Sequence, residues 1–281
     1  MGAPVGLIAG HGRFPLELAS AARRRGRRLA AVAFEGLADP GLAAHVDVME
    51  TLPLGQVERL LGVLRREGVR EVVLAGKVPK GILFRAGRLE PDARALGLLR
   101  ELQDRKDDSI LRAVARLLEG EGFELLAQAD LAPELLASEG VLGRVQPTTA
   151  QRADVAFAWP IAKALGALDV GQTVVVEGGA VLALEAIEGT DEAVRRGCAL
   201  GRGGACVVKV AKPSQDPRFD VPAVGLETLR VLREGGGAIL AFEAGATLVL
   251  ERDALVAEAD AAGIALLGVA DAGGVAPGRV G

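Results

Sequence analysis

The segment from Lys209 to Gly225 gathers charges of both signs and several prolines directly after a buried apolar run. Lys212 and Arg218 could neutralise phosphate oxygens, and Asp216 or Asp220 could bind Mg²⁺ or orient a water molecule. Proteins commonly hold Mg²⁺ with one or two carboxylates together with substrate phosphates. These residue types favour a site for a phosphate-bearing substrate over the alternative, a purely structural polar loop.

A helix start lies upstream of this segment. Thr190 and Asp191 follow a long apolar stretch and begin an amphipathic run. The first N–H groups of a helix point toward an anion, and Asp191 adds a carboxylate. We expect both residues to line the same site.

Glycine-rich turns mark a second region where a phosphate could bind. Gly10-His11-Gly12 stands between the apolar run Val5–Ala9 and a helix that opens near Pro15. Gly76-Lys77 follows the run Glu71–Ala75 and should lie at the same edge of a sheet. A tight turn without a ligand and an ordinary solvated lysine are the simpler alternatives.

Two further residue patterns each permit more than one interpretation. Gly10, Gly12 and the distant Glu35 resemble a dinucleotide fingerprint, but Pro15 stands where the third glycine belongs. Asp107 and Asp108 precede an amphipathic run, where they could cap a helix or contact substrate.

The elements that would position these residues are typical of an α/β protein. In the first part, short apolar runs alternate with helical patterns, which predicts a parallel sheet covered by helices. In the second part, Gly178-Gly179 separates two apolar runs and predicts a hairpin, so that sheet should be mixed. Weak periodicity between Asp130 and Gln151 suggests domains at residues 1–131 and 132–281, with the charged loop in the second.

Composition excludes several classes of protein. The net charge of -4 and an aromatic content of 3% argue against a nucleic-acid partner. Two cysteines, no export signal and no apolar run near the ~20 residues of a membrane span favour a cytoplasmic protein. Peripheral attachment to a membrane stays open.

Five segments, taken in order, resemble the LpxI family of UDP-2,3-diacylglucosamine diphosphatases of lipid A biosynthesis. They are GLIAGHGRFP, AGKVPK, RKDDSILRAV, DVGQTVVVEGGAVLALEAIEGTDE and KVAKPSQDPRFDVPAVGLETL. This chain differs from the family pattern in the first segment, where the family usually has three successive glycines and this chain has Gly10-His11-Gly12.

The resemblance implies an N-terminal Rossmann-like domain, a second α/β domain and hydrolysis of the substrate pyrophosphate to UMP and 2,3-diacylglucosamine 1-phosphate. It also implies Mg²⁺ or another divalent cation such as Mn²⁺. The apolar composition and the absence of a span lead us to expect peripheral contact with the cytoplasmic face of the inner membrane. A homodimer stays open. The family's catalytic aspartate, in a D-x-P-x-x-G context, matches Asp220.

The predicted site therefore has three parts. Asp220 is the expected catalytic residue, and Asp220 with Asp191 the expected metal ligands. The expected substrate contacts are Gly10, His11, Gly12, Gly76, Lys77, Asp107, Asp108, Thr190, Asp191, Lys209, Lys212 and Gln215. A nicotinamide-dependent oxidoreductase and a non-catalytic nucleotide sensor are the rival functions.

Overall fold

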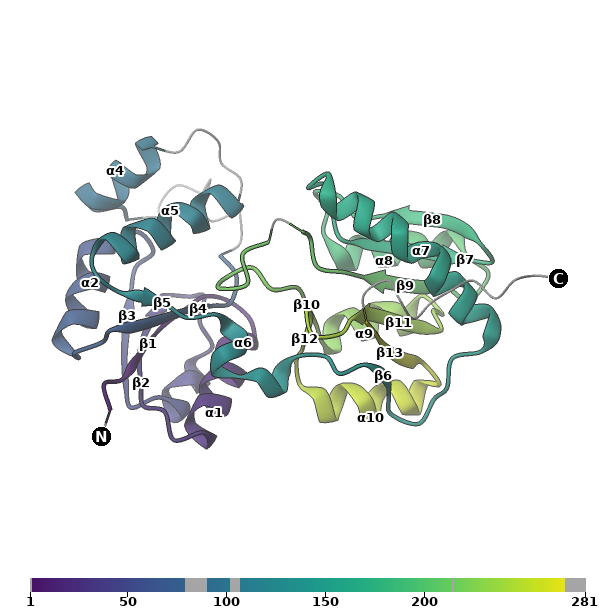
Figure 1. Cartoon of the computed structure of the whole chain (residues 1–281), viewed down its shortest axis with the longest axis horizontal. Helices are drawn as coiled ribbons and strands as arrows, with labels where there is room; N and C mark the ends of the chain where they lie inside the picture. Colours follow the sequence, from purple (N-terminus) through teal and green to yellow (C-terminus); the bar gives the residue numbers. More distant parts are fainter. Residues whose placement is uncertain (1, 79–89, 102–106, 214, 271–281) are drawn as a thin grey trace. The chain divides into compact units, whose positions relative to one another are not determined.

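The computed structural model describes residues 2–78, 90–101, 107–213 and 215–270 of the chain (Figure 1). By their contacts they form two compact units. Unit 1 is Met1–Glu134 with Asp216–Asp220, and unit 2 is Leu135–Gln215 with Val221–Gly281. The charged loop is thus divided between the units, whereas the sequence had suggested that all of it belongs to the second domain.

Unit 1 is built on a five-stranded, fully parallel sheet in the order β3-β2-β1-β4-β5. This order confirms the predicted Rossmann-like fold. Its strands are β1 (Val5–Ala9), β2 (Leu29–Phe34), β3 (Val48–Leu52), β4 (Glu71–Ala75) and β5 (Glu124–Leu125). Its α-helices are α1 (Phe14–Arg24), α2 (Val57–Arg66), α4 (Ala93–Glu101), α5 (Asp107–Gly120) and α6 (Gln128–Leu131).

Different helices cover the two faces of this sheet. Ile8, Val32 and Val72 share one core cluster with α2 and α5, because every second residue of a strand points to the same face. Helix α1 packs against β1, β2 and β4, and Figure 1 shows it on the opposite side of the sheet from α5. Burial on both faces explains why these strands are almost entirely apolar.

Unit 2 contains a six-stranded sheet in the order β6-β13-β11-β9-β7-β8. The strands β9, β11 and β13 are parallel, while β6, β7 and β8 pair antiparallel, which confirms the predicted mixed sheet. The strands are β6 (Gly140–Leu142), β7 (Thr173–Glu177), β8 (Ala180–Leu184), β9 (Cys206–Lys209), β11 (Ile239–Glu243) and β13 (Ala265–Val269). A separate parallel pair joins β10 (Ala223–Val224) to β12 (Leu248–Val249).

Helices cover both faces of this second sheet. Helix α7 (Thr149–Ala167) packs on one face through Val155, Ala158 and Trp159. The core on the other face includes Val194, Leu229 and Leu255. These residues come from α8 (Thr190–Leu200), α9 (Leu226–Glu234) and α10 (Arg252–Ala262), respectively. The carboxyl ends of β9 and β11 are thereby held in a rigid, two-sided framework.

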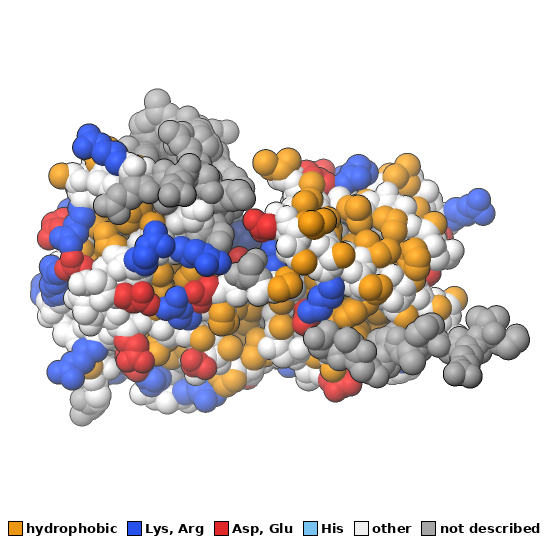
Figure 2. All heavy atoms as spheres, turned by 45° about the horizontal axis from the view of Figure 1, so that its top comes forward, with side chains coloured by type: hydrophobic (Ala, Val, Ile, Leu, Met, Phe, Trp, Pro, Cys, Tyr) orange, Lys and Arg blue, Asp and Glu red, His pale blue; other side chains and the backbone are white. Residues whose placement is uncertain are grey.

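The described surface includes exposed apolar side chains on unit 2, several of which are visible as orange spheres in Figure 2. The large ones on this unit are Phe157, Leu168, Val170, Val181, Leu184, Ile187 and Leu200. Within the described ranges, no helix is both long and apolar enough to cross a membrane.

Candidate functional site

The structure brings together the two predicted glycine turns of unit 1. The N–H of Gly10 donates to the carbonyl of Ala75 (2.8 Å). His11 and Lys77 exchange two backbone hydrogen bonds of 2.7 and 2.9 Å. Gly10, His11, Gly76 and Lys77 therefore form one joined edge at the carboxyl ends of β1 and β4.

The three glycines at this edge have different roles. A Cβ on Gly10 would lie 2.7 Å from the carbonyl oxygen of Lys77, and one on Gly76 would lie 2.8 Å from the carbonyl oxygen of His11. These two glycines allow the turns to pack against each other. Gly12 has a φ of +103° and nothing within 4 Å of a built Cβ, so the space beside it is open.

The start of α1 lies next to Gly12, and the N–H groups of Leu16 and Glu17 both donate to the Arg13 carbonyl (3.1 Å) within its first turn. Its first turn contains the buried Pro15, and the Cβ of an alanine at Gly76 would lie 2.9 Å from the Pro15 ring. His11 Nδ1 lies 3.3 Å from the carbonyl oxygen of Leu37. An anion at the start of α1 is compatible with this geometry.

The segment Asp216–Asp220 forms a compact turn within unit 1. The carbonyl of Asp216 accepts hydrogen bonds from the N–H groups of Phe219 (3.2 Å) and Asp220 (2.9 Å). The Asp216 carboxylate accepts from the N–H of Arg218 (3.0 Å). Phe219 is only 7% exposed and belongs to the core cluster under α2 and α5. The turn and this apolar anchor restrict the backbone at Asp220, which is half-buried.

An ion-pair chain ties the same turn to α5. The Arg218 guanidinium donates to the Asp216 carboxylate (2.7 Å) and pairs with Glu119 of α5. The hydrogen bonds from Arg218 hold the pKa of Asp216 below its ordinary value. Asp216 therefore acts as a structural anion of the turn.

In unit 2 the structure brings together three other predicted residues. Lys209 ends β9 and is 6% exposed, and its Nζ lies 3.2 Å from Thr190 Oγ1 at the start of α8. The Thr190 hydroxyl donates to Glu185 Oε1 (3.0 Å), and Asp191 Oδ1 accepts from Thr228 Oγ1 (2.8 Å). This cluster combines a helix N-terminus, an ammonium and carboxylates, which suits a phosphate with a cation.

Lys212 and Gln215 form a small turn in the outgoing part of the loop. The side-chain oxygen of Gln215 accepts from the N–H of Lys212 (2.8 Å), and Gln215 N–H donates to the Lys212 carbonyl (3.2 Å). The Lys212 ammonium pairs with Asp169 (2.9 Å). Within unit 2 these two residues therefore stabilise the loop by contacts with the chain itself.

Asp107 and Asp108 are the first described residues of α5, and their side chains lie outside what the structure describes. The same holds for the whole of residues 79, 80, 105 and 106 in two of the resembling segments. Asp191 and Asp220 belong to different units, and each is described within its own unit.

The predicted metal ligands fit Mg²⁺ in donor type. Within the described ranges, no three His, Cys, Asp or Glu side chains form a group that could hold a metal ion. Mg²⁺ typically needs only one or two protein carboxylates when phosphates complete its shell. Asp191 in unit 2 and Asp220 in unit 1 are each of this donor type.

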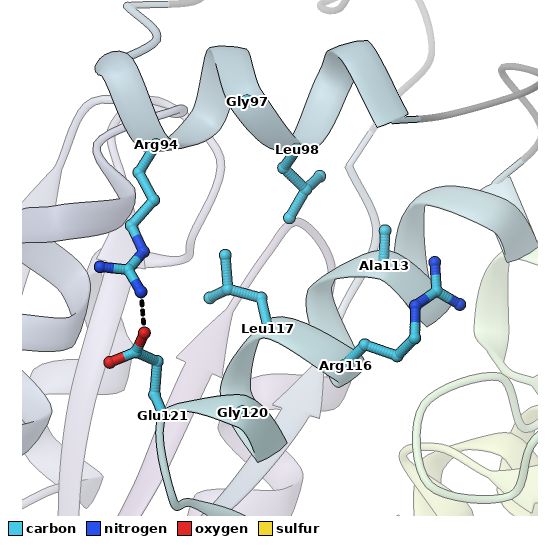
Figure 3. A pocket seen from close by; sticks show the side chains of 8 residues that line it. All are labelled: Arg94, Gly97, Leu98, Ala113, Arg116, Leu117, Gly120 and Glu121. Carbon is cyan, nitrogen blue, oxygen red and sulfur yellow. Dashed lines mark ion pairs between the residues drawn. The ribbon is translucent and has the colours of Figure 1, made fainter.

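A groove between α4 and α5 lies apart from the predicted residues. It has a volume of about 430 Å³, and Figure 3 shows Leu98 and Leu117 facing each other across it while Arg94 pairs with Glu121. The other lining residues are Gly97, Ala113, Arg116 and Gly120. The Arg94 charge is neutralised within the groove, and Arg116 also lines it, so the groove combines apolar and cationic side chains.

Sequence reasoning missed residues that act through the loop. Phe219 was not predicted to enter a core, and Glu243, the last residue of β11, was not singled out although it is 7% exposed. A charged residue at the carboxyl end of a buried strand was the available signal for Glu243, because ligands and active-site loops gather at that edge. Nothing local marks Phe219, since the other residues of its cluster lie about 95 to 210 residues earlier in the chain.

Comparison with known proteins places these features in a family. Residues 4–135 match the model of the LpxI N-terminal domain, and residues 138–267 match that of the LpxI C-terminal domain. The chain belongs to the LpxI family. It is 37% identical over 276 residues to the UDP-2,3-diacylglucosamine pyrophosphatase LpxI of Caulobacter vibrioides, with 94% of this chain and 97% of that protein covered. In this LpxI-family chain the two matched domains include both clusters of predicted site residues.

Proposed function

We propose that the chain hydrolyses the pyrophosphate of UDP-2,3-diacylglucosamine, giving UMP and 2,3-diacylglucosamine 1-phosphate in lipid A biosynthesis. The observation that carries the proposal is the 37% identity, over 94% of the chain, to a relative named for this pyrophosphatase activity. The expected aspartate, Asp220, is held in a fixed turn, and a cluster suited to phosphate lies at Thr190 and Asp191.

Hydrolysis of a pyrophosphate needs neutralisation of charge and a positioned water more than covalent help. The first turn of α8, beginning at Thr190, offers N–H groups to phosphate oxygens. In unit 1 the space beside Gly12, at the start of α1, is open to a phosphate. Asp220 accepts a proton from the attacking water or binds the cation, and both roles need its carboxylate ionised.

A divalent cation is part of the proposal. When bound, Mg²⁺ supplies positive charge to the phosphate oxygens, and Asp220 and Asp191 are the carboxylates proposed to hold it. We expect exhaustive EDTA treatment to abolish UMP release and added Mg²⁺ to restore it. Full activity after chelation would exclude a cation requirement.

The direct test is incubation of the purified chain with UDP-2,3-diacylglucosamine and Mg²⁺, followed by measurement of UMP. A nicotinamide-dependent oxidoreductase would instead change the absorbance of NADH, and a nucleotide sensor would bind without turnover. The buried Pro15 at the third glycine position counts against the first rival, because that glycine is needed for close helix–strand packing. Binding without UMP release would leave only the sensor.

We further propose that the enzyme meets its lipid substrate by peripheral contact with a membrane. Ile187 is 92% exposed and lies three residues before Thr190, and Leu184, at 40% exposed, precedes it. Insertion of such side chains into a lipid surface contributes by removing apolar area from water. The contact would bring the lipid to the same end of α8 that carries Thr190.

A further inference from the structure

The loop that carries Asp220 begins at the carboxyl edge of the six-stranded unit 2 sheet and ends in the separate β10–β12 pair. It leaves β9 after Lys209 and returns at β10, which starts at Ala223. Its middle part, Asp216–Asp220, belongs to unit 1, so the two stems are the parts that unit 2 holds. Each stem is bound by one buried, charged side chain.

Glu243 binds the outgoing stem. This residue ends β11 and is 7% exposed. One carboxylate oxygen accepts from the N–H of Ala211 (2.8 Å), two residues into the loop, and the other pairs with Lys163 of α7 (2.6 Å). A carboxylate is costly to bury unless it is paired and hydrogen-bonded, so the contact with Ala211 is built into the unit 2 core.

Lys209 binds the returning stem. Its Nζ donates to the carbonyl of Ala223 (2.8 Å) and also contacts Thr190 Oγ1 (3.2 Å). Ala223 lies three residues after Asp220, and Phe219, directly before Asp220, is anchored in the unit 1 core. Asp220 therefore lies between two anchored points of the chain.

The two side chains reach the loop from opposite faces of the sheet. Lys209 lies opposite Phe242 in the register of β9 and β11, so the next residue, Glu243, points to the other face. Their partners agree, because Lys163 comes from α7 on one face and Thr190 from α8 on the other. The loop stems are thus restrained from both sides.

We propose that Glu243 and Lys209 are positioning residues for the reaction: they hold the outgoing and returning stems of the loop and thereby direct the Asp220 carboxylate. The proposal rests on the catalytic role of Asp220 in the proposed function. The Lys209 ammonium also belongs to the cluster that suits a phosphate, so its hydrogen bond to Ala223 adds a positioning role to the contact predicted from sequence. A loss of either stem contact should misplace Asp220, and Glu243 lies outside that cluster, so its loss removes no expected substrate contact.

The test compares Glu243→Ala with a matched control, Asp154→Ala. Asp154 is also a buried carboxylate of unit 2, and it accepts the N–H groups of Gly178 (2.9 Å) and Gly179 (2.7 Å) in the hairpin turn. That turn lies at the other edge of the sheet from the loop, since Val176 pairs with Cys206 and Thr173 with Lys209. Both variants should lower Tm, but only Glu243→Ala should lower kcat, by about 10- to 100-fold with KM nearly unchanged.

Two further variants test the proposal even if Glu243→Ala folds poorly. Glu243→Gln retains an oxygen for the Ala211 N–H and should keep kcat within about threefold of wild type. Lys209→Met keeps the side-chain length but cannot donate to Ala223, and should lower kcat as Glu243→Ala does. Equal kcat in folded Lys209→Met and wild type would overturn the role of Lys209.

A double-mutant cycle separates positioning from a general structural effect. In an Asp220→Ala background, Glu243→Ala should change the residual rate by less than about twofold, because the group it positions is gone. An undiminished effect in that background, or a wild-type kcat for folded Glu243→Ala, would overturn the positioning role. Absence of UMP release by the wild-type chain would overturn the proposed function instead, so the two failures are distinguishable.

Discussion

Asp216 and Asp220 stand four residues apart in one turn, yet their surroundings give them different roles. The Asp216 carboxylate is occupied by Arg218, both through its side chain and through its backbone N–H. Asp220 joins the turn through its backbone N–H. The composition of the loop left a catalytic role open for either aspartate, and the structure assigns the Asp216 carboxylate to the turn.

The lowered pKa of Asp216 makes a prediction for stability against pH. Because Arg218 holds the folded pKa of Asp216 below its ordinary value, the charge stabilises the fold above that ordinary value, about 4. This contribution is lost as the pH falls through the folded pKa. We expect wild type to exceed Asp216→Asn in unfolding free energy by about 1 kcal/mol at pH 7, and the difference to vanish at the acid end.

Denaturant unfolding of both proteins between pH 7 and pH 2 measures this difference. Asparagine keeps an acceptor for the Arg218 N–H, so the comparison isolates the charge. A difference in unfolding free energy that stays constant over this pH range would contradict the pairing.

At the scale of elements, the glycine turns at the ends of β1 and β4 predict two different responses to alanine. Gly10→Ala places a Cβ 2.7 Å from a backbone oxygen and should destabilise by about 2 kcal/mol or more. Gly12→Ala meets no atom, and its cost should be the strain of its φ of +103°, about 1 kcal/mol. Because its methyl group would enter the open space at the start of α1, Gly12→Ala should raise KM.

Chemical denaturation and steady-state kinetics on both variants check this pair. Equal destabilisation would contradict the packing role of Gly10. An unchanged KM in Gly12→Ala would show that no substrate phosphate approaches there.

Strands made of long apolar runs that end at glycines could be predicted from sequence. Gly178 and Gly179 both have positive φ and close the hairpin of β7 and β8, as their types indicated. The strand β3 was missed because its edge position leaves most of its residues partly exposed, and Val48, Met49 and Glu50 show no clear alternation. The strand β6 has only three residues, too few for a period to be recognised.

The site residues likewise include some that local sequence predicted and others that it did not. The clusters around Gly10 and Thr190 could be predicted, since each lies where a strand passes into a helix. The contacts of Glu243 with Ala211 and of Phe219 with the unit 1 core join residues distant in the chain. Such contacts arise from packing, and local patterns do not encode them.

At the scale of the molecule, the chain passes between units 1 and 2 at Glu134–Leu135 and again on both sides of Asp216–Asp220. The segment with the proposed catalytic residue therefore belongs to one unit while its stems belong to the other. Residues 4–135 and 138–267 match two separate domains of the LpxI family, and the segment of Asp220 falls within the second match. These five residues thus belong to the C-terminal domain by sequence match but pack within unit 1.

Peripheral membrane contact is a prediction at this scale. Ile187→Ser should reduce binding to phosphatidylethanolamine–phosphatidylglycerol vesicles several-fold, because it removes a fully exposed apolar group from the lipid surface. Leu200→Ser is the control, since Leu200 is 65% exposed at the other end of α8. Cosedimentation measures the bound fraction, and equal losses in both variants would argue against contact through Ile187.

The most direct test of the account is the single-turnover rate of UMP release by Asp220→Ala, measured beside wild type with saturating UDP-2,3-diacylglucosamine and Mg²⁺. We expect the rate to fall by several powers of ten while Tm and substrate affinity stay close to wild type, because the lost interaction acts mainly as charge develops. A purely structural role would lower Tm and leave the rate of the folded protein unchanged. A folded Asp220→Ala protein that releases UMP at the wild-type rate would contradict the account.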